Sequence, residues 1–153
     1  MNILLLSSEV AGIMKSGGLA DVAKALPLQL QAEGHDVRVV MPCYTTIKDY
    51  DKLEVIAHGV LNENNPDEKL RIPYSIRKTY LNKVVEVWLV ECPRYFDRTS
   101  MYGDNNQAYA DNGERFAFFS AAALDACKHL NYWFDILHCN DWQTGIAPML
   151  MRI

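Results

Sequence analysis

The chain opens on a short, continuously apolar strand that leads through a glycine-bearing junction into a helix. Ile3 to Leu6 are all aliphatic, which predicts a strand from Asn2 to Ser7 that is buried on both faces. From Gly18 onward, apolar residues recur at helical spacing, at Leu19, Val22, Ala23, Leu26 and Leu30. Strands buried on both faces are typical of sheets covered by helices, so this opening predicts an α/β fold.

A second apolar strand, Val37 to Met41, follows once Gly34 and His35 have ended the helix. Strand, helix and strand within about 40 residues predict a βαβ unit with a right-handed crossover and two parallel strands. Pro27 lies inside the helical pattern and predicts a kink or a local break there.

The middle of the chain departs from this alternation. Residues 53–61, 70–80 and 84–90 have strand character and are separated by polar turns, which predicts an antiparallel excursion inserted into a mostly parallel sheet. Residues 91–112 form a polar stretch dotted with aromatic residues, for which a functional loop and disorder are both open readings. A helix over 113–130, a strand over 135–139 and a last helix from Asp141 or Trp142 complete the pattern.

Composition restricts the class of protein. The 153 residues, half of them hydrophobic, are enough for about one domain, and the last apolar helical pattern stops without a capping signal, as in a truncated chain. A net charge of −4 disfavours binding to nucleic acid or anionic membranes, and neither a signal peptide nor a membrane span is expected. Four cysteines without ligand spacing indicate neither zinc nor redox chemistry, and reduced thiols point to a cytoplasmic protein.

The junction between the first strand and the first helix has the features of a phosphate site. Helix N-termini attract anions, Gly17 and Gly18 lack a Cβ and leave the backbone open, and Lys15 adds a cation. Neither a P-loop nor a GxGxxG motif is present, which disfavours P-loop kinases and NAD enzymes. A tight turn and a solvated lysine remain the plain alternative.

A second junction, at His138 to Gln143, is expected at the same edge, because the carboxyl ends of parallel strands lie together. There Trp142 is suited to stack on a sugar ring, and Asp141, like Asp21, is suited to accept hydrogen bonds from hydroxyls. The two junctions together predict a sugar-phosphate site. As alternatives, Asp141 only caps a helix and Trp142 only buries its indole.

The stretch Lys15-Ser16-Gly17-Gly18-Leu19-Ala20-Asp21-Val22 closely resembles K-[ST]-G-G-L-[AG]-D-V, the signature of bacterial glycogen synthases and plant starch synthases (glycosyltransferase family five). The resemblance covers essentially the whole chain. It continues in family order through Ser7 to Val10, Gly34 to Val39, Met41 to Tyr44, Tyr102 to Asp104, Asp111-Asn112 with Arg115-Phe116, and Asn140 to Trp142.

The resemblance implies retaining transfer of glucose from ADP-glucose to the non-reducing end of an α-1,4-glucan, without a metal or another cofactor. It implies the GT-B fold, in which two Rossmann-like domains enclose the active site. Residues 1–153 would then be most of the N-terminal domain, the C-terminal nucleotide-binding domain would be absent, and the fragment alone would be inactive.

Carried over by position, the resemblance makes Asp21 and Asp141 catalytic and gives substrate contacts to Lys15, Gly17, Gly18, Tyr95 and Trp142. Lys15 and the glycines would meet the diphosphate, and the others would lie toward the acceptor glucan and the transferred glucose. Gln143 stands where many relatives have histidine, so no role is expected of a histidine there. A stand-alone sugar-phosphate or glucan-binding domain, and a GT-B glycosyltransferase with another donor, remain alternatives.

Overall fold

The computed structural model describes residues 1–152. Its strands are β1 (Asn2–Leu6), β2 (Asp36–Pro42), β3 (Val55–Leu61), β4 (Ile72–Leu81), β5 (Val85–Glu91), β6 (Gly103–Asp104), β7 (Gln107–Ala108) and β8 (Ile136–Cys139). Its α-helices are α1 (Gly18–Ala32), α2 (Pro93–Phe96), α3 (Asn112–His129) and α4 (Ala147–Leu150). Short 3-10 turns are η1 (Tyr50–Lys52), η2 (Glu68–Leu70) and η3 (Trp142–Thr144).

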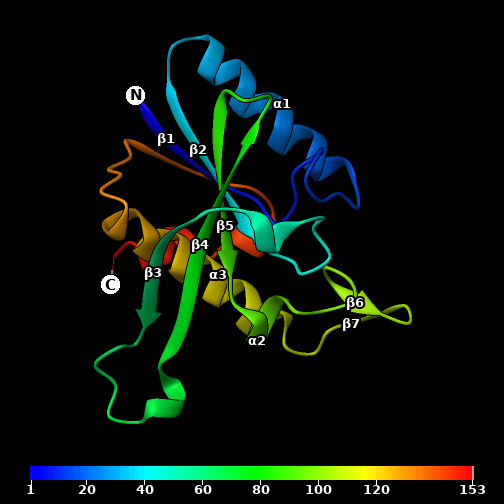
Figure 1. Cartoon of the computed structure of the whole chain (residues 1–153), viewed down its shortest axis with the longest axis vertical. Coiled ribbons are helices and arrows are strands. Elements are labelled where there is room, and N and C mark those ends of the chain that lie inside the picture. Colours follow the sequence, from blue (N-terminus) through cyan, green and yellow to red (C-terminus); the bar gives the residue numbers. More distant parts are fainter. Residues whose placement is uncertain (153) are drawn as a thin grey trace.

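Six strands form one sheet in the order β3-β4-β5-β2-β1-β8. The pairs β1–β2, β1–β8 and β2–β5 are parallel, and β1 lies between β2 and β8. The predicted α/β fold with a mostly parallel sheet is confirmed, and so is the βαβ unit made by β1, α1 and β2 (Figure 1).

The antiparallel excursion is also confirmed, as an extension of the same sheet. β3 pairs with β4 and β4 with β5, both antiparallel, while β5 returns to pair in parallel with β2. At Gly59 in β3, a Cβ would come within 2.4 Å of the Tyr74 ring on β4, so only glycine lets this ring lie across the strand.

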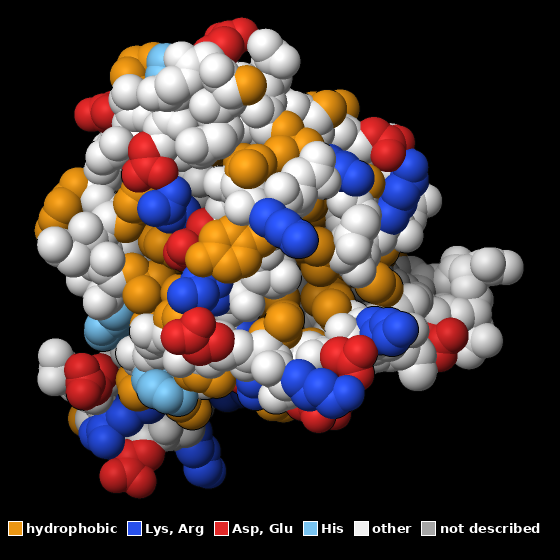
Figure 2. Space-filling view, turned by 45° about the horizontal axis from the view of Figure 1, so that its top comes forward, with side chains coloured by type: hydrophobic (Ala, Val, Ile, Leu, Met, Phe, Trp, Pro, Cys, Tyr) orange, Lys and Arg blue, Asp and Glu red, His pale blue; other side chains and the backbone are white. Residues whose placement is uncertain are grey.

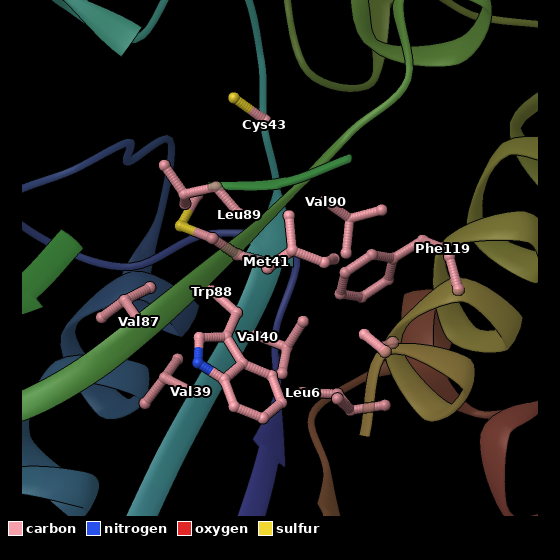
Figure 3. Packing of buried hydrophobic residues seen from close by; sticks show 14 of the residues in the cluster. Leu6, Val39, Val40, Met41, Cys43, Val87, Trp88, Leu89, Val90 and Phe119 are labelled. Atoms are coloured by element: carbon pink, nitrogen blue, oxygen red, sulfur yellow. The ribbon is translucent and has the colours of Figure 1, made fainter. Parts of the chain in front are cut away.

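The sheet is covered on both faces, and its side chains alternate between them. Figure 3 shows Val39 and Val87 on the side of the blue helix α1, and Val40 and Val90 on the side of Phe119 from α3. All five side chains are fully buried. This two-sided burial explains why β1 and β2 are nearly continuous apolar runs in the sequence.

The polar stretch over residues 91–112 contains secondary structure. It includes α2 and the hairpin β6–β7, which stands out from the body in Figure 1. The fully buried guanidinium of Arg115, on α3, donates from Nε to Tyr95 O (2.7 Å) and from Nη1 to Met101 O (2.9 Å) and Asn112 Oδ1 (2.7 Å). This side chain therefore anchors the segment to α3.

Glycine and proline mark helix ends, as is typical of these residues, but Pro27 does not break α1. Gly34, at φ +87°, ends α1 as predicted, and His35 N donates to Leu30 O. Pro27 is buried inside α1 without breaking it. The expected last helix is divided into η3 and α4, with Pro148 in the first turn of α4.

The surface carries mixed charge. Figure 2 shows basic and acidic side chains interspersed over one face, without a field of a single sign. Within residues 1–152, no helix is long and apolar enough to cross a membrane.

Candidate functional site

The two junctions singled out in the sequence lie at one edge of the sheet. β1 and β8 are parallel neighbours, with Leu6 opposite Cys139 at their carboxyl ends. Asn140 then ties the second junction to the first strand, because its backbone N–H (3.1 Å) and its side-chain amide (3.0 Å) both donate to Leu6 O. The chain segments that follow β1 and β8, which lead to Lys15 and to Asp141, therefore start side by side at this edge.

Lys15 and Asp21 form an ion pair with each other. Lys15 Nζ donates to both carboxylate oxygens of Asp21, at 2.6 and 2.7 Å, and the side chains are 47% and 60% exposed. An exposed pair of this kind stabilises a fold by about 0–1 kcal/mol, because water screens it. The ammonium is thus held beside the first turn of α1, where Asp21 lies.

Gly17 and Gly18 leave open space beside the backbone. Gly17 has φ −151° and ψ −164°, an extended conformation that any residue adopts, and neither glycine has a positive φ. A Cβ at either position would meet no atom within 4 Å. A tight turn therefore does not account for the two glycines, whereas close approach by a ligand would.

Glu9 is a part of the site that the sequence reasoning did not assign. Its carboxylate is 3% exposed and accepts hydrogen bonds from Ser16 N (2.5 Å), Gly17 N (3.1 Å) and Ser16 Oγ (3.1 and 3.2 Å). The Gly17 amide, expected to face a diphosphate, is therefore already occupied by a carboxylate. An acidic residue just after a buried strand was the available signal.

Tyr102 is the second unassigned part. Its hydroxyl donates to Glu9 Oε1 (3.1 Å) and shares a hydrogen bond with Ser8 Oγ (2.7 Å). Its ring lies 6.0 Å from Phe116 and 6.4 Å from Trp142. Burial raises the pKa of the Tyr102 hydroxyl, which therefore keeps its proton and stays a donor.

Asp141 and Trp142 are both exposed. Asp141 caps η3, since its Oδ1 accepts from Trp142 N at 2.7 Å, but its backbone has φ +62° and ψ −175°, a region almost restricted to glycine. Such strain costs about 1–3 kcal/mol and concentrates at functional sites. Trp142 is 55% exposed and stands edge-on to Phe116 at 5.2 Å, so its indole is not simply buried.

Tyr95 lies in the core, away from these residues. Its side chain is 3% exposed, its ring packs on Phe118 at 4.7 Å, and its hydroxyl donates to Glu114 Oε1 at 2.5 Å. Burial and this carboxylate raise the pKa of Tyr95 to about 12. The structure brings the other predicted site residues to one edge but offers no face of Tyr95 to a ligand.

Hydroxyl groups line a pocket beside the glycines. This pocket, of about 330 Å³, is bounded by Met14, Ser16, Thr99, Ser100, Met101, Tyr102 and Gly103. In residues 1–152, no group of three or more His, Cys, Asp or Glu side chains is arranged to hold a metal ion. The edge therefore combines a cation, open helix amides, an exposed indole and several hydroxyls.

Comparison with known proteins identifies relatives along the whole chain. Residues 2–153 match the family model for the starch synthase catalytic domain. The glycogen synthases of Aeromonas salmonicida and Photobacterium profundum are 53% and 47% identical, over 99% of this chain and 31% and 29% of theirs. The chain thus spans about 30% of the length of the curated relatives it matches.

A solved structure has the same fold. The catalytic domain of starch synthase IV from Arabidopsis thaliana, bound to ADP and acarbose, superposes with a TM-score of 0.77 at 27% identity. The match covers 98% of this chain and 30% of that one. The predicted Rossmann-like part of a GT-B fold is therefore confirmed, and the chain belongs to the starch synthase catalytic domain family.

Proposed function

We propose that this chain forms the donor- and acceptor-facing N-terminal part of a retaining glucosyltransferase, which moves glucose from ADP-glucose to the non-reducing end of an α-1,4-glucan. The observation that carries the proposal is the convergence of Lys15, Gly17 and Gly18 with Asp141 and Trp142 at one sheet edge. Supporting it, the similar chains are named glycogen synthases, and the similar structure holds ADP.

On the donor side, breaking the bond between glucose and phosphate leaves negative charge on the departing diphosphate. The first amides of α1 have no partner within the helix and point out of its start, where Gly18 leaves the backbone open. Lys15 supplies the full positive charge once its ammonium turns from Asp21 to the diphosphate. Fixed groups of this kind stabilise charge as it develops and need no bound metal or other cofactor.

On the acceptor side, the exposed indole of Trp142 provides a flat apolar face for a sugar ring. Asp141 uses one carboxylate oxygen on Trp142 N and keeps the other for a sugar hydroxyl. The hydroxyls of Thr99 and Ser100, in the pocket beside Ser16, continue this polar edge. Tyr95 has a role here only if a partner or ligand uncovers it.

The proposal includes a second domain across this edge, because the relatives extend far beyond the matched region. That domain would bind most of the nucleotide, and residues 1–153 alone would transfer no glucose. A cytoplasmic location is part of the proposal, since the four cysteines are free thiols and three of them are buried.

The test is incorporation of labelled glucose into glycogen by the full-length gene product, with ADP-glucose and UDP-glucose compared as donors. Transfer from ADP-glucose is the expected result. A clear preference for UDP-glucose would favour another GT-B glycosyltransferase. Failure to transfer from either donor, by a protein that binds glycogen, would favour a non-catalytic glucan-binding domain.

A further inference from the structure

The buried carboxylate of Glu9 is unusual because no cation accompanies it. Among residues 1–152, Glu9 takes part in no ion pair, and its partners are two backbone amides and the hydroxyls of Ser16 and Tyr102. Burying a carboxylate without a cation is costly unless hydrogen bonds satisfy it. A loop between β1 and α1 could be built without a buried carboxylate. The presence of Glu9 here therefore points to a role in the adjacent site.

Glu9 fixes the backbone directly after Lys15. Ser16 follows Lys15 directly, and both its N–H and its hydroxyl are held by the Glu9 carboxylate, as is the N–H of Gly17. Ser16 and Gly17, the two residues directly before α1, are therefore held in place by Glu9. By occupying the amides of Ser16 and Gly17, the carboxylate also directs an incoming anion forward to Gly18 and to the ammonium of Lys15.

Tyr102 links this arrangement to the other junction. Its hydroxyl holds the second oxygen of Glu9, while its ring faces Phe116 and Trp142. The backbone of Tyr102 is anchored independently, because its carbonyl accepts from Tyr109 N (3.0 Å) and from Asn112 Nδ2 (2.8 Å). One side chain on a fixed backbone thus contacts both halves of the edge.

We infer that Glu9 and Tyr102 are positioning residues that hold the diphosphate-binding segment Lys15 to Gly18 at a set distance from Trp142. The inference rests on the proposed function. Neither side chain touches the reacting atoms. Glu9 acts through the backbone before α1, and Tyr102 acts through Glu9 on one side and through its ring on the other.

Two substitutions separate the two contacts of Tyr102. Tyr102→Phe removes the hydroxyl and keeps the ring. Because the hydrogen bond to the charged Glu9 is lost, the KM for the donor should rise about tenfold. Because the ring beside Trp142 stays, the KM for the glucan should remain within twofold. Tyr102→Ala also removes the ring beside Trp142, so it should raise both KM values. Glu9→Gln should resemble Tyr102→Phe.

Tyr132→Phe is the matched control. It removes the hydroxyl of a buried tyrosine, which donates to Ile3 O (3.2 Å) and Asp36 O (2.9 Å) near the amino-terminal ends of β1 and β2, away from the edge that carries the site. Thermal unfolding of the full-length variants should show similar losses for Tyr102→Phe and Tyr132→Phe, whereas only Tyr102→Phe should change the KM for the donor.

The outcomes distinguish this inference from the function on which it rests. An active protein in which Tyr102→Phe and Glu9→Gln have the kinetics of Tyr132→Phe would overturn the positioning role and leave the transferase intact. If the full-length protein without substitutions neither transfers glucose nor binds ADP, both the proposed function and the positioning role are refuted.

Discussion

Lys15→Ala tests the donor side of the site, because the structure separates what Lys15 contributes to folding from what it would contribute to transfer. The ammonium is about half exposed and pairs with an Asp21 carboxylate that is more exposed still. Loss of such a pair lowers the free energy of unfolding by about 1 kcal/mol at most. Loss of one group that stabilises a developing anion raises the barrier by about 2–4 kcal/mol, or about 30- to 1,000-fold in rate.

The assay is the initial rate of glucose transfer by the full-length protein at saturating glucan, with thermal unfolding measured on the same samples. Asp21→Asn breaks the same ion pair from the other side, so its effect on unfolding should match that of Lys15→Ala. Lys52→Ala is the remote control, since Lys52 pairs with Asp49 at 2.8 Å and is 72% exposed. A transfer rate within twofold of the unchanged protein would refute the role of Lys15, as would a loss of rate explained by unfolding.

The remaining predictions concern two glycines, the buried Arg115 and two buried thiols. Gly59→Ala should lower the free energy of unfolding by about 1–3 kcal/mol in a denaturant titration, because the new methyl group meets a buried tyrosine ring, whereas Gly17→Ala should leave stability unchanged and weaken ADP binding. Arg115→Met should lower the free energy of unfolding by about 3 kcal/mol in the same titration, because Tyr95 O, Met101 O and Asn112 Oδ1 lose a charged donor. Unchanged stability would contradict the anchoring role. Burial raises the pKa of Cys43 and Cys127 to about 12, so between pH 9 and pH 12 the unfolded chain ionises first and the free energy of unfolding should fall as the pH rises. At pH 8 both thiols should resist alkylation until the protein unfolds, and rapid labelling of the native protein would refute their burial.

The local pattern of the sequence determined the framework of the protein. Apolar runs at β1 and β2 and helical spacing in α1 predicted a parallel α/β sheet, because side-chain periodicity reports directly which faces are buried. Chain order then placed the segment before α1 and the Asp141–Trp142 pair at one edge, since parallel strands end together. The cation, the bare glycines and the exposed indole were all visible as residue types in these segments.

Tertiary structure decided which polar groups meet within that edge. The contact between Tyr102 and Glu9 joins residues 93 positions apart, and no local pattern indicates that a carboxylate would fill the amides before α1. Tyr95 is buried for a similar reason, because α2 turns its ring onto α3. Periodicity predicts which faces are covered, but partners distant in the sequence come together only once the sheet and helices are packed.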